Sequence, residues 1–139
     1  GEVLRESGYS KRDENGKIIK IEGKPIKVPG RLQNVKGMGV LLEKYGMSQV
    51  SMNLTNFRVT PIHVAFEECK KEAERLGVKV TGSEIVGLVP LEALLDAGKF
   101  YAEGKDYCEK DLVKLAIDSL GLSDLHPFNP EQKIIDYMI

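Results

Sequence analysis

The sequence predicts a mixed α+β domain, of the α/β class in its broad sense, from three observations. Turn residues such as Asn15-Gly16 separate pairs of extended segments in the first half of the chain. Two amphipathic helical segments follow, each with a proline at its start, Pro61 and Pro90. Apolar residues make up 42% of the 139 residues, so the chain can bury a core without a metal or a disulfide.

The first part of the chain is expected to contain the end of a helix and two hairpins. Residues 1–7 have the pattern of a last helical turn, closed by Gly8. A short hairpin is expected over residues 17–28 and a longer one over residues 34–57. The turn of the longer hairpin falls at Tyr45-Gly46.

The second strand of the longer hairpin alternates between apolar and polar side chains. Its apolar face holds Val50, Met52 and Leu54, and its polar face holds Gln49, Ser51, Asn53 and Thr55. A solvated face usually carries Lys and Glu. A row of neutral donors and acceptors is instead typical of a surface that is desolvated while its groups stay hydrogen-bonded. The alternative is an ordinary polar face in water.

Helices dominate the expected second half. The first helix has Thr60 as N-cap and ends at Gly77, with an apolar stripe formed by Ile62, Phe66, Cys69, Ala73 and Leu76. Val78 and Val80 resume an extended run, and residues 85–89 have the composition of a short buried strand.

Three further helical segments are expected after that strand. Pro90 opens one helix, and residues 110–122 form another that ends at Gly121. Residues 131–139 have the pattern of the start of a helix. One strand placed before residue 1 would give the order βαββαβ, the ferredoxin-like plan. We therefore expect a ferredoxin-like sheet with helices on one face, its opening strand missing, a hairpin insertion and C-terminal helices.

Two further places in the sequence have the chemistry of a binding site. The helix start at Thr60 offers free N–H groups and a positive dipole end to a carboxylate, with Arg58 beside it, although most helix starts bind only water. In "GSE", Gly82 permits close backbone approach and Ser83 offers a hydroxyl. Glu84 is the one acid among apolar neighbours, and its alternative role is pairing at a strand edge.

Composition and motifs argue against several protein classes. The formal net charge is −1 with scattered Lys and Arg, so no nucleic-acid-binding surface is expected, and no apolar run approaches membrane-spanning length. Cys69 and Cys108 have no paired spacing, which argues against a zinc site or a disulfide and is typical of the reducing cytoplasm. His63 has no histidine at helical spacing, and His126 lies in a proline-containing loop, so no metal pair is expected.

Three long stretches resemble a known family. They are "QVSMNLTNFRVTPIHVAFEE", "VTGSEIVGLVPLEALLDAGKFY" and "LGLSDLHPFNPEQKIIDYMI". They are similar to the C-terminal half of the formimidoyltransferase domain, found in glutamate formimidoyltransferase and in formimidoyltransferase-cyclodeaminase. The resemblance implies a C-terminal transferase subdomain over residues 1–103 and a helical extension towards a cyclodeaminase part over residues 104–139.

The resemblance implies a folate-dependent transferase of histidine breakdown. The family moves a formimidoyl group between 5-formimidoyltetrahydrofolate and L-glutamate, with tetrahydrofolate as carrier and no metal. Its ligand tunnel lies between two subdomains, and its general acid/base histidine belongs to the N-terminal one, so His63 is not assigned that role. We expect no catalytic residue in this chain and no activity without the N-terminal subdomain. The substrate-binding residues expected here are Gln49, Ser51, Asn53, Arg58, Ser83 and Glu84.

Another class of protein fits the same sequence. A ferredoxin-like domain can act as a stand-alone small-molecule-binding or dimerisation module, since fold alone does not fix function. A sheet that lacks its first strand exposes an edge, and such an edge allows a homo-oligomer. Transfer activity with and without the N-terminal subdomain separates these hypotheses.

Overall fold

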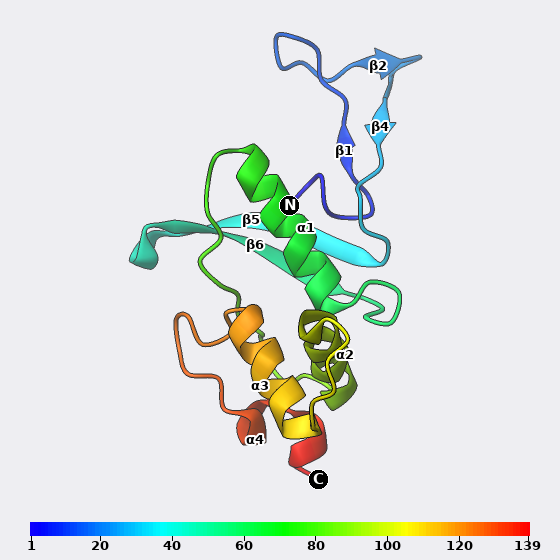
Figure 1. The fold of residues 1–139 in the computed structure, drawn as a ribbon. Helices are drawn as coiled ribbons and strands as arrows, with labels where there is room; N and C mark the ends of the chain where they lie inside the picture. The colour runs from blue at the N-terminus through cyan, green and yellow to red at the C-terminus, as the bar shows by residue number, and fades with distance from the viewer. The chain divides into compact units, whose positions relative to one another are not determined.

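The computed structural model describes residues 1–139 and divides into two compact units. Unit 1 is Gly1–Thr60 and unit 2 is Pro61–Ile139. The longer strands lie in unit 1 and the helices of more than one turn lie in unit 2 (Figure 1). The predicted mixed α/β class is confirmed. No helix combines the length and apolar character that crossing a membrane requires.

The longer hairpin dominates unit 1. Strand β5 (Val35–Leu42) pairs antiparallel with strand β6 (Met47–Leu54) along their whole length, and the one-turn helix η1 (Glu43–Tyr45) connects them. Gly46 closes the connection with a φ of 61°, a left-handed conformation in which a side chain is disfavoured. The predicted turn at Tyr45-Gly46 is confirmed. The predicted alternation along β6 is also confirmed, because exposed Ser51 and Asn53 alternate with half-buried Met52 and Leu54.

Four two-residue strands form the rest of the unit 1 pairing. Strand β1 (Tyr9–Ser10) pairs with β4 (Lys27–Val28), and β2 (Lys20–Ile21) pairs with β3 (Lys24–Pro25), all antiparallel. The short hairpin is therefore present, although its strands are shorter than the sequence pattern predicts.

The predicted helix end at residues 1–7 is wrong: these residues form turns. Their backbone groups bond to the segment that leads into β5 and to its first residue: the Leu32 N–H donates to the Leu4 carbonyl, and the Glu6 N–H donates to the Val35 carbonyl. Gly30 makes this approach sterically feasible, because a Cβ there would lie 1.7 Å from the Arg5 carbonyl oxygen. One bond of helical type remains, from the Arg5 N–H to the Gly1 carbonyl at 3.0 Å, and long-range pairing takes the place of a continued helix.

The three main helices of unit 2 follow the sequence pattern closely. They are α1 (Ile62–Arg75), α2 (Leu91–Ala102) and α3 (Glu109–Ser119). Gly77 and Gly121 follow α1 and α3 with φ values of 74° and 60°, as expected for residues that end helices. The predicted N-cap of α1 is wrong: Pro61 is the N-cap, and the Thr60 hydroxyl donates to the Gln33 carbonyl at 2.6 Å.

The core of unit 2 lies between α2 and α3. Leu94, Ala97, Ala116 and Leu120 are fully buried there. Gly98 lets the helices approach closely, because a Cβ on it would lie 2.3 Å from the Leu112 carbonyl oxygen. Helices α2 and α3, which lie on either side of residue 103, thus pack directly on each other, and the division of the chain at residue 103 stays a prediction.

The segment between α1 and α2 departs from the prediction. Residues 85–89 do not form a buried strand: Val86 is 90% exposed, and only Val89 makes a bridge, parallel to Ile134. Val78 also lies outside any strand and is exposed. The ferredoxin-like plan is not confirmed, because the final strand of its βαββαβ order is missing from the structure.

The C-terminal segment is also different from the predicted helix. Helix α4 (Pro130–Lys133) is a single turn, and the short helix η2 (Ile135–Tyr137) follows it. Ile134 interrupts them in an extended conformation because it is fully buried and pairs with Val89. The Asp136 carboxylate then accepts the Leu91 N–H at 2.8 Å, which caps the start of α2.

Candidate functional site

The exposed face of β6 presents the predicted row of neutral polar groups. Gln49, Ser51 and Asn53 share one face, where Gln49 is half-buried and the other two are exposed. Directly opposite on β5 lie Val40, Met38 and Lys36, respectively. Met38 is 59% exposed, so a polar row runs beside an uncovered apolar one. This combination suits contact with a ligand or another protein surface better than contact with water alone.

Two other predicted groups near this face have local partners. The Thr55 hydroxyl donates to the Asn34 carbonyl at 2.9 Å, which leaves Thr55 a structural role. Arg58 is exposed, and its guanidinium lies over the Phe57 ring at 4.8 Å from the centroid. The Asn56 side chain accepts the Arg58 N–H at 3.1 Å and so fixes this turn.

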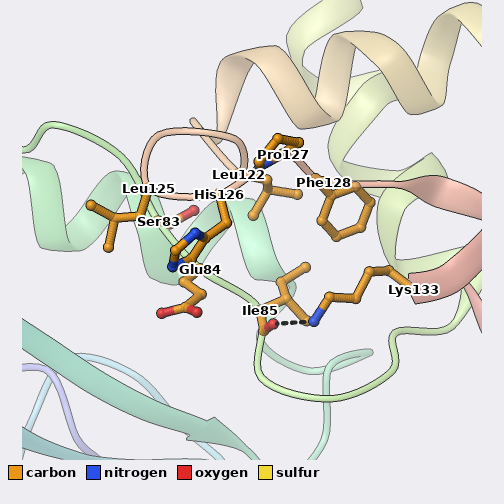
Figure 2. Close-up of a pocket in the computed structure, with 9 residues that line it drawn as sticks. All are labelled: Ser83, Glu84, Ile85, Leu122, Leu125, His126, Pro127, Phe128 and Lys133. Atoms are coloured by element: carbon orange, nitrogen blue, oxygen red, sulfur yellow. Dashed lines mark hydrogen bonds between the residues drawn. The ribbon is translucent and has the colours of Figure 1, made fainter.

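Unit 2 contains a pocket of about 150 Å³ that includes both other predicted site residues (Figure 2). It is lined by Ser83, Glu84, Ile85, Leu122, Leu125, His126, Pro127, Phe128 and Lys133. Segments from three places in the sequence therefore meet here: residues 83–85, residues 122–128 and Lys133. A more open hollow of about 350 Å³ beside the end of α1 contains none of the predicted residues.

Gly82 and Ser83 attach this segment to the end of α3. Ser83 donates its N–H to the Gly121 carbonyl at 3.1 Å and its hydroxyl to the Leu120 carbonyl at 2.5 Å. A Cβ on Gly82 would lie 2.7 Å from the Gly121 carbonyl oxygen. The close backbone approach predicted for Gly82 is confirmed, and its partner is the chain itself. These contacts satisfy carbonyl groups that the end of a helix leaves without intrahelical partners.

Two polar groups at the pocket mouth have no partner. Glu84 and His126 are both exposed, and both line the pocket (Figure 2). Neither side chain makes a hydrogen bond or an ion pair in the structure. By contrast, the Lys133 ammonium donates to the Ile85 carbonyl at 3.2 Å and to the Gly87 carbonyl at 3.4 Å. The unused hydrogen-bonding capacity of the pocket therefore lies at its Glu84 end.

Sequence reasoning missed Lys133 and Phe128 and gave His126 no role. Local pattern could not have found them, because Lys133 lies 48 residues from the carbonyl that it binds. The structure has no group of three or more His, Cys, Asp or Glu side chains arranged to hold a metal ion.

His63 belongs to a separate aromatic cluster between α1 and α2. Its ring stacks on Phe100 with centroids 4.6 Å apart, and the Tyr101 hydroxyl donates to Glu67 at 2.8 Å. His63 is only 9% exposed, and its Nδ1 is buried without a partner. Burial lowers the pKa of His63, and the carboxylates of Asp96 and Glu67 offset part of that shift. Burial and the bond to Glu67 together raise the pKa of Tyr101.

The lowered pKa of His63 predicts a pH dependence of stability. The unfolded chain binds a proton on this imidazole near its ordinary pKa of about 6.5, whereas the folded chain does so only at lower pH. Unfolding therefore takes up a proton in this window, and the free energy of unfolding falls as the pH decreases below about 6.5. Urea titrations of the wild type and His63→Phe across this range measure it. An equal slope in both proteins would contradict the prediction.

Comparison with known proteins matches nearly the whole chain to one protein family. A family model described as the formiminotransferase domain matches residues 2–139. Formimidoyltransferase-cyclodeaminase from Dictyostelium discoideum is 47% identical over 124 residues, which are 87% of this chain and 23% of that protein. The same-named protein from Mus musculus is 43% identical over an equal length. Glutamate formimidoyltransferase from Thermoplasma acidophilum is 45% identical over 85 residues, 61% of this chain and 28% of that protein. The chain thus spans less than a third of the length of these relatives.

Proposed function

Because this chain belongs to the formiminotransferase domain family, we propose that it is the substrate- and folate-positioning part of a glutamate formimidoyltransferase. The reaction moves a formimidoyl group between 5-formimidoyltetrahydrofolate and L-glutamate in histidine degradation, with tetrahydrofolate as carrier. The family match over residues 2–139 carries the proposal. Its cellular location would be the cytoplasm.

The site residues would act by positioning. Gln49, Ser51 and Asn53 offer neutral donors and acceptors on the exposed face of β6, and Arg58 offers a cation to a carboxylate. The hydroxyl of Ser83 holds a backbone carbonyl, so Ser83 acts by placing its neighbour Glu84. The pocket of about 150 Å³ is smaller than the roughly 300–1,000 Å³ typical of ligand sites, so a folate needs a surface beyond this pocket.

In the proposed mechanism the glutamate amine attacks the formimidoyl carbon. A new C–N bond forms, a tetrahedral intermediate follows, and the bond from that carbon to the folate nitrogen breaks. The amine loses a proton and the departing folate nitrogen gains one, through groups of the N-terminal subdomain. This chain contributes orientation, a factor that can account for several orders of magnitude in rate.

A mixing experiment tests the proposal. This chain is combined with an N-terminal formiminotransferase subdomain, and formimidoyl transfer is measured for each part and for the mixture. We expect transfer only in the mixture. Transfer by this chain alone would overturn the partial role, and no transfer in the mixture would count against the transferase.

Matched variants test the β6 face within that experiment. Ser51→Ala combined with Asn53→Ala is expected to lower kcat/KM of the mixture by roughly 10- to 100-fold, because misplaced substrate loses orientation. Ser48→Ala is the control, since Ser48 is exposed on the same strand but on its other face. An equal effect of both sets of substitutions would remove the β6 face from the site.

One observation favours a dimerisation module as the second candidate function. Met38 and Val40 are 59% and 37% exposed on the same face as the polar row, and they form an apolar strip that a second copy could cover. Sedimentation equilibrium separates the two. A dimer that Met38→Lys dissociates, together with an inactive mixture, would favour the module.

A further inference from the structure

We infer that the pocket beside Glu84 binds a small organic cation, an ammonium or amidinium group attached to a compact apolar body. The inference names the ligand class of a site that the proposed function also uses, and it rests on that function only for the ligand's biological identity. Its physical basis is the difference between the polar groups of the pocket that have partners and those that have none.

The charges of the pocket favour a cation at the Glu84 end. The side chains of Glu84 and His126 both line the pocket, and neither makes a hydrogen bond or an ion pair (Figure 2). Lys133 is the only cationic residue of the lining, and it already donates to two backbone carbonyls, those of Ile85 and Gly87. A ligand N–H at Glu84 forms a charge-assisted hydrogen bond, whereas a carboxylate ligand there meets an unpaired negative charge.

The lining fixes the size and character of the remainder of the ligand. Leu122 is buried, Leu125 and Phe128 are half-buried, and all three contribute apolar surface to the pocket. Its volume of about 150 Å³ is near that of a cavity that holds one benzene ring. The Ser123 hydroxyl accepts the Phe128 N–H at 3.0 Å and so fixes the loop that carries the aromatic ring. One ring or a short alkyl chain therefore fills the site.

A metal ion fits the same groups poorly. One carboxylate and one imidazole fall short of the three or four protein ligands of typical zinc sites. The apolar lining offers no further ligand, whereas it complements the hydrocarbon part of an organic cation. The polar and apolar groups of the pocket therefore favour an organic cation over a metal ion.

Benzamidinium is the probe that tests the inference, titrated into this chain while backbone NMR shifts are followed. We expect saturable shifts at residues 84–85 and 125–128, with benzoate, which has the same ring and the opposite charge, binding at least roughly tenfold more weakly. Glu84→Gln is expected to weaken benzamidinium binding by about tenfold. Glu131→Gln removes the same charge at an exposed position outside the pocket and should leave binding unchanged.

Several results would overturn the assignment: no saturable shifts, equal binding of benzoate, or equal losses in Glu84→Gln and Glu131→Gln. Glu84 is exposed and has no partner, so its amide variant is expected to fold normally, and the helical circular dichroism signal checks this. The titration needs only this chain. If benzamidinium binds but the mixture with the N-terminal subdomain shows no formimidoyl transfer, the transferase proposal is rejected and the cation site stands. If the mixture is active but benzamidinium does not bind, the cation site is rejected and the transferase proposal stands.

Discussion

Gly98→Ala is expected to lower the free energy of unfolding of unit 2 by about 2–3 kcal/mol. In an exposed helix the same change would stabilise by about 1 kcal/mol, because alanine has the higher helix propensity. Here the new Cβ would lie 2.3 Å from the carbonyl oxygen of Leu112 and 2.8 Å from its carbonyl carbon. Both atoms belong to the backbone of α3, so the contact is relieved only by moving one helix away from the other.

Urea unfolding followed by the helical circular dichroism signal measures this effect, because the three long helices all lie in unit 2. Lys99→Ala is the control, since Lys99 is the exposed neighbour of Gly98 in α2. We expect a change within about 0.5 kcal/mol for that variant. Stabilisation by Gly98→Ala would mean that α2 and α3 do not pack as closely as the structure has them.

Ile134→Ala is expected to cost about 3 kcal/mol, the second large effect. Its side chain is fully buried, and it lies between two short helical turns where it pairs with Val89. Truncation leaves a cavity that the surrounding helices fill only in part, so lost burial and the cavity both contribute.

The neighbouring residue provides a matched control for this substitution. Ile135 is the same residue type but is 43% exposed, so Ile135→Ala should cost less than about 1 kcal/mol. The same urea titration compares the two. Equal effects would show that the C-terminal segment is not part of the core of unit 2.

Local signals predicted most of the regular structure. Alternation along residues 47–54 gave the strand and its two faces, since strand side chains alternate with a period of two. A proline at the start and a glycine after the end located α1, and a glycine located the end of α3, each within about two residues. These features depend on interactions between residues that are close in the sequence, so local sequence patterns predict them.

Features that depend on distant partners could not be predicted. A short apolar run such as residues 85–89 has the same pattern in a strand as in an irregular segment, and its partners are the residues around Ile134. The helix predicted at residues 1–7 was wrong for the same reason, because the backbone groups of these residues pair with the segment that leads into β5. Glu84 was predicted as a site residue from its chemistry alone, and the structure places it at a pocket. The residues around it in the pocket were not, because the loop at residues 122–128 reaches it only through the packing of unit 2.

The cap on α2 affects the order in which parts of the protein can fold during translation. Asp136 holds the start of α2 from 45 residues further along the chain, and Lys133 holds the Ile85 carbonyl from 48 residues further along. At roughly 5–20 residues per second, translation must continue for about 2–10 s after Glu84 is made before these bonds can form. The hairpin of unit 1 can close long before that time. The Glu84 pocket is therefore completed after the unit 1 hairpin, and only once Lys133 has been made.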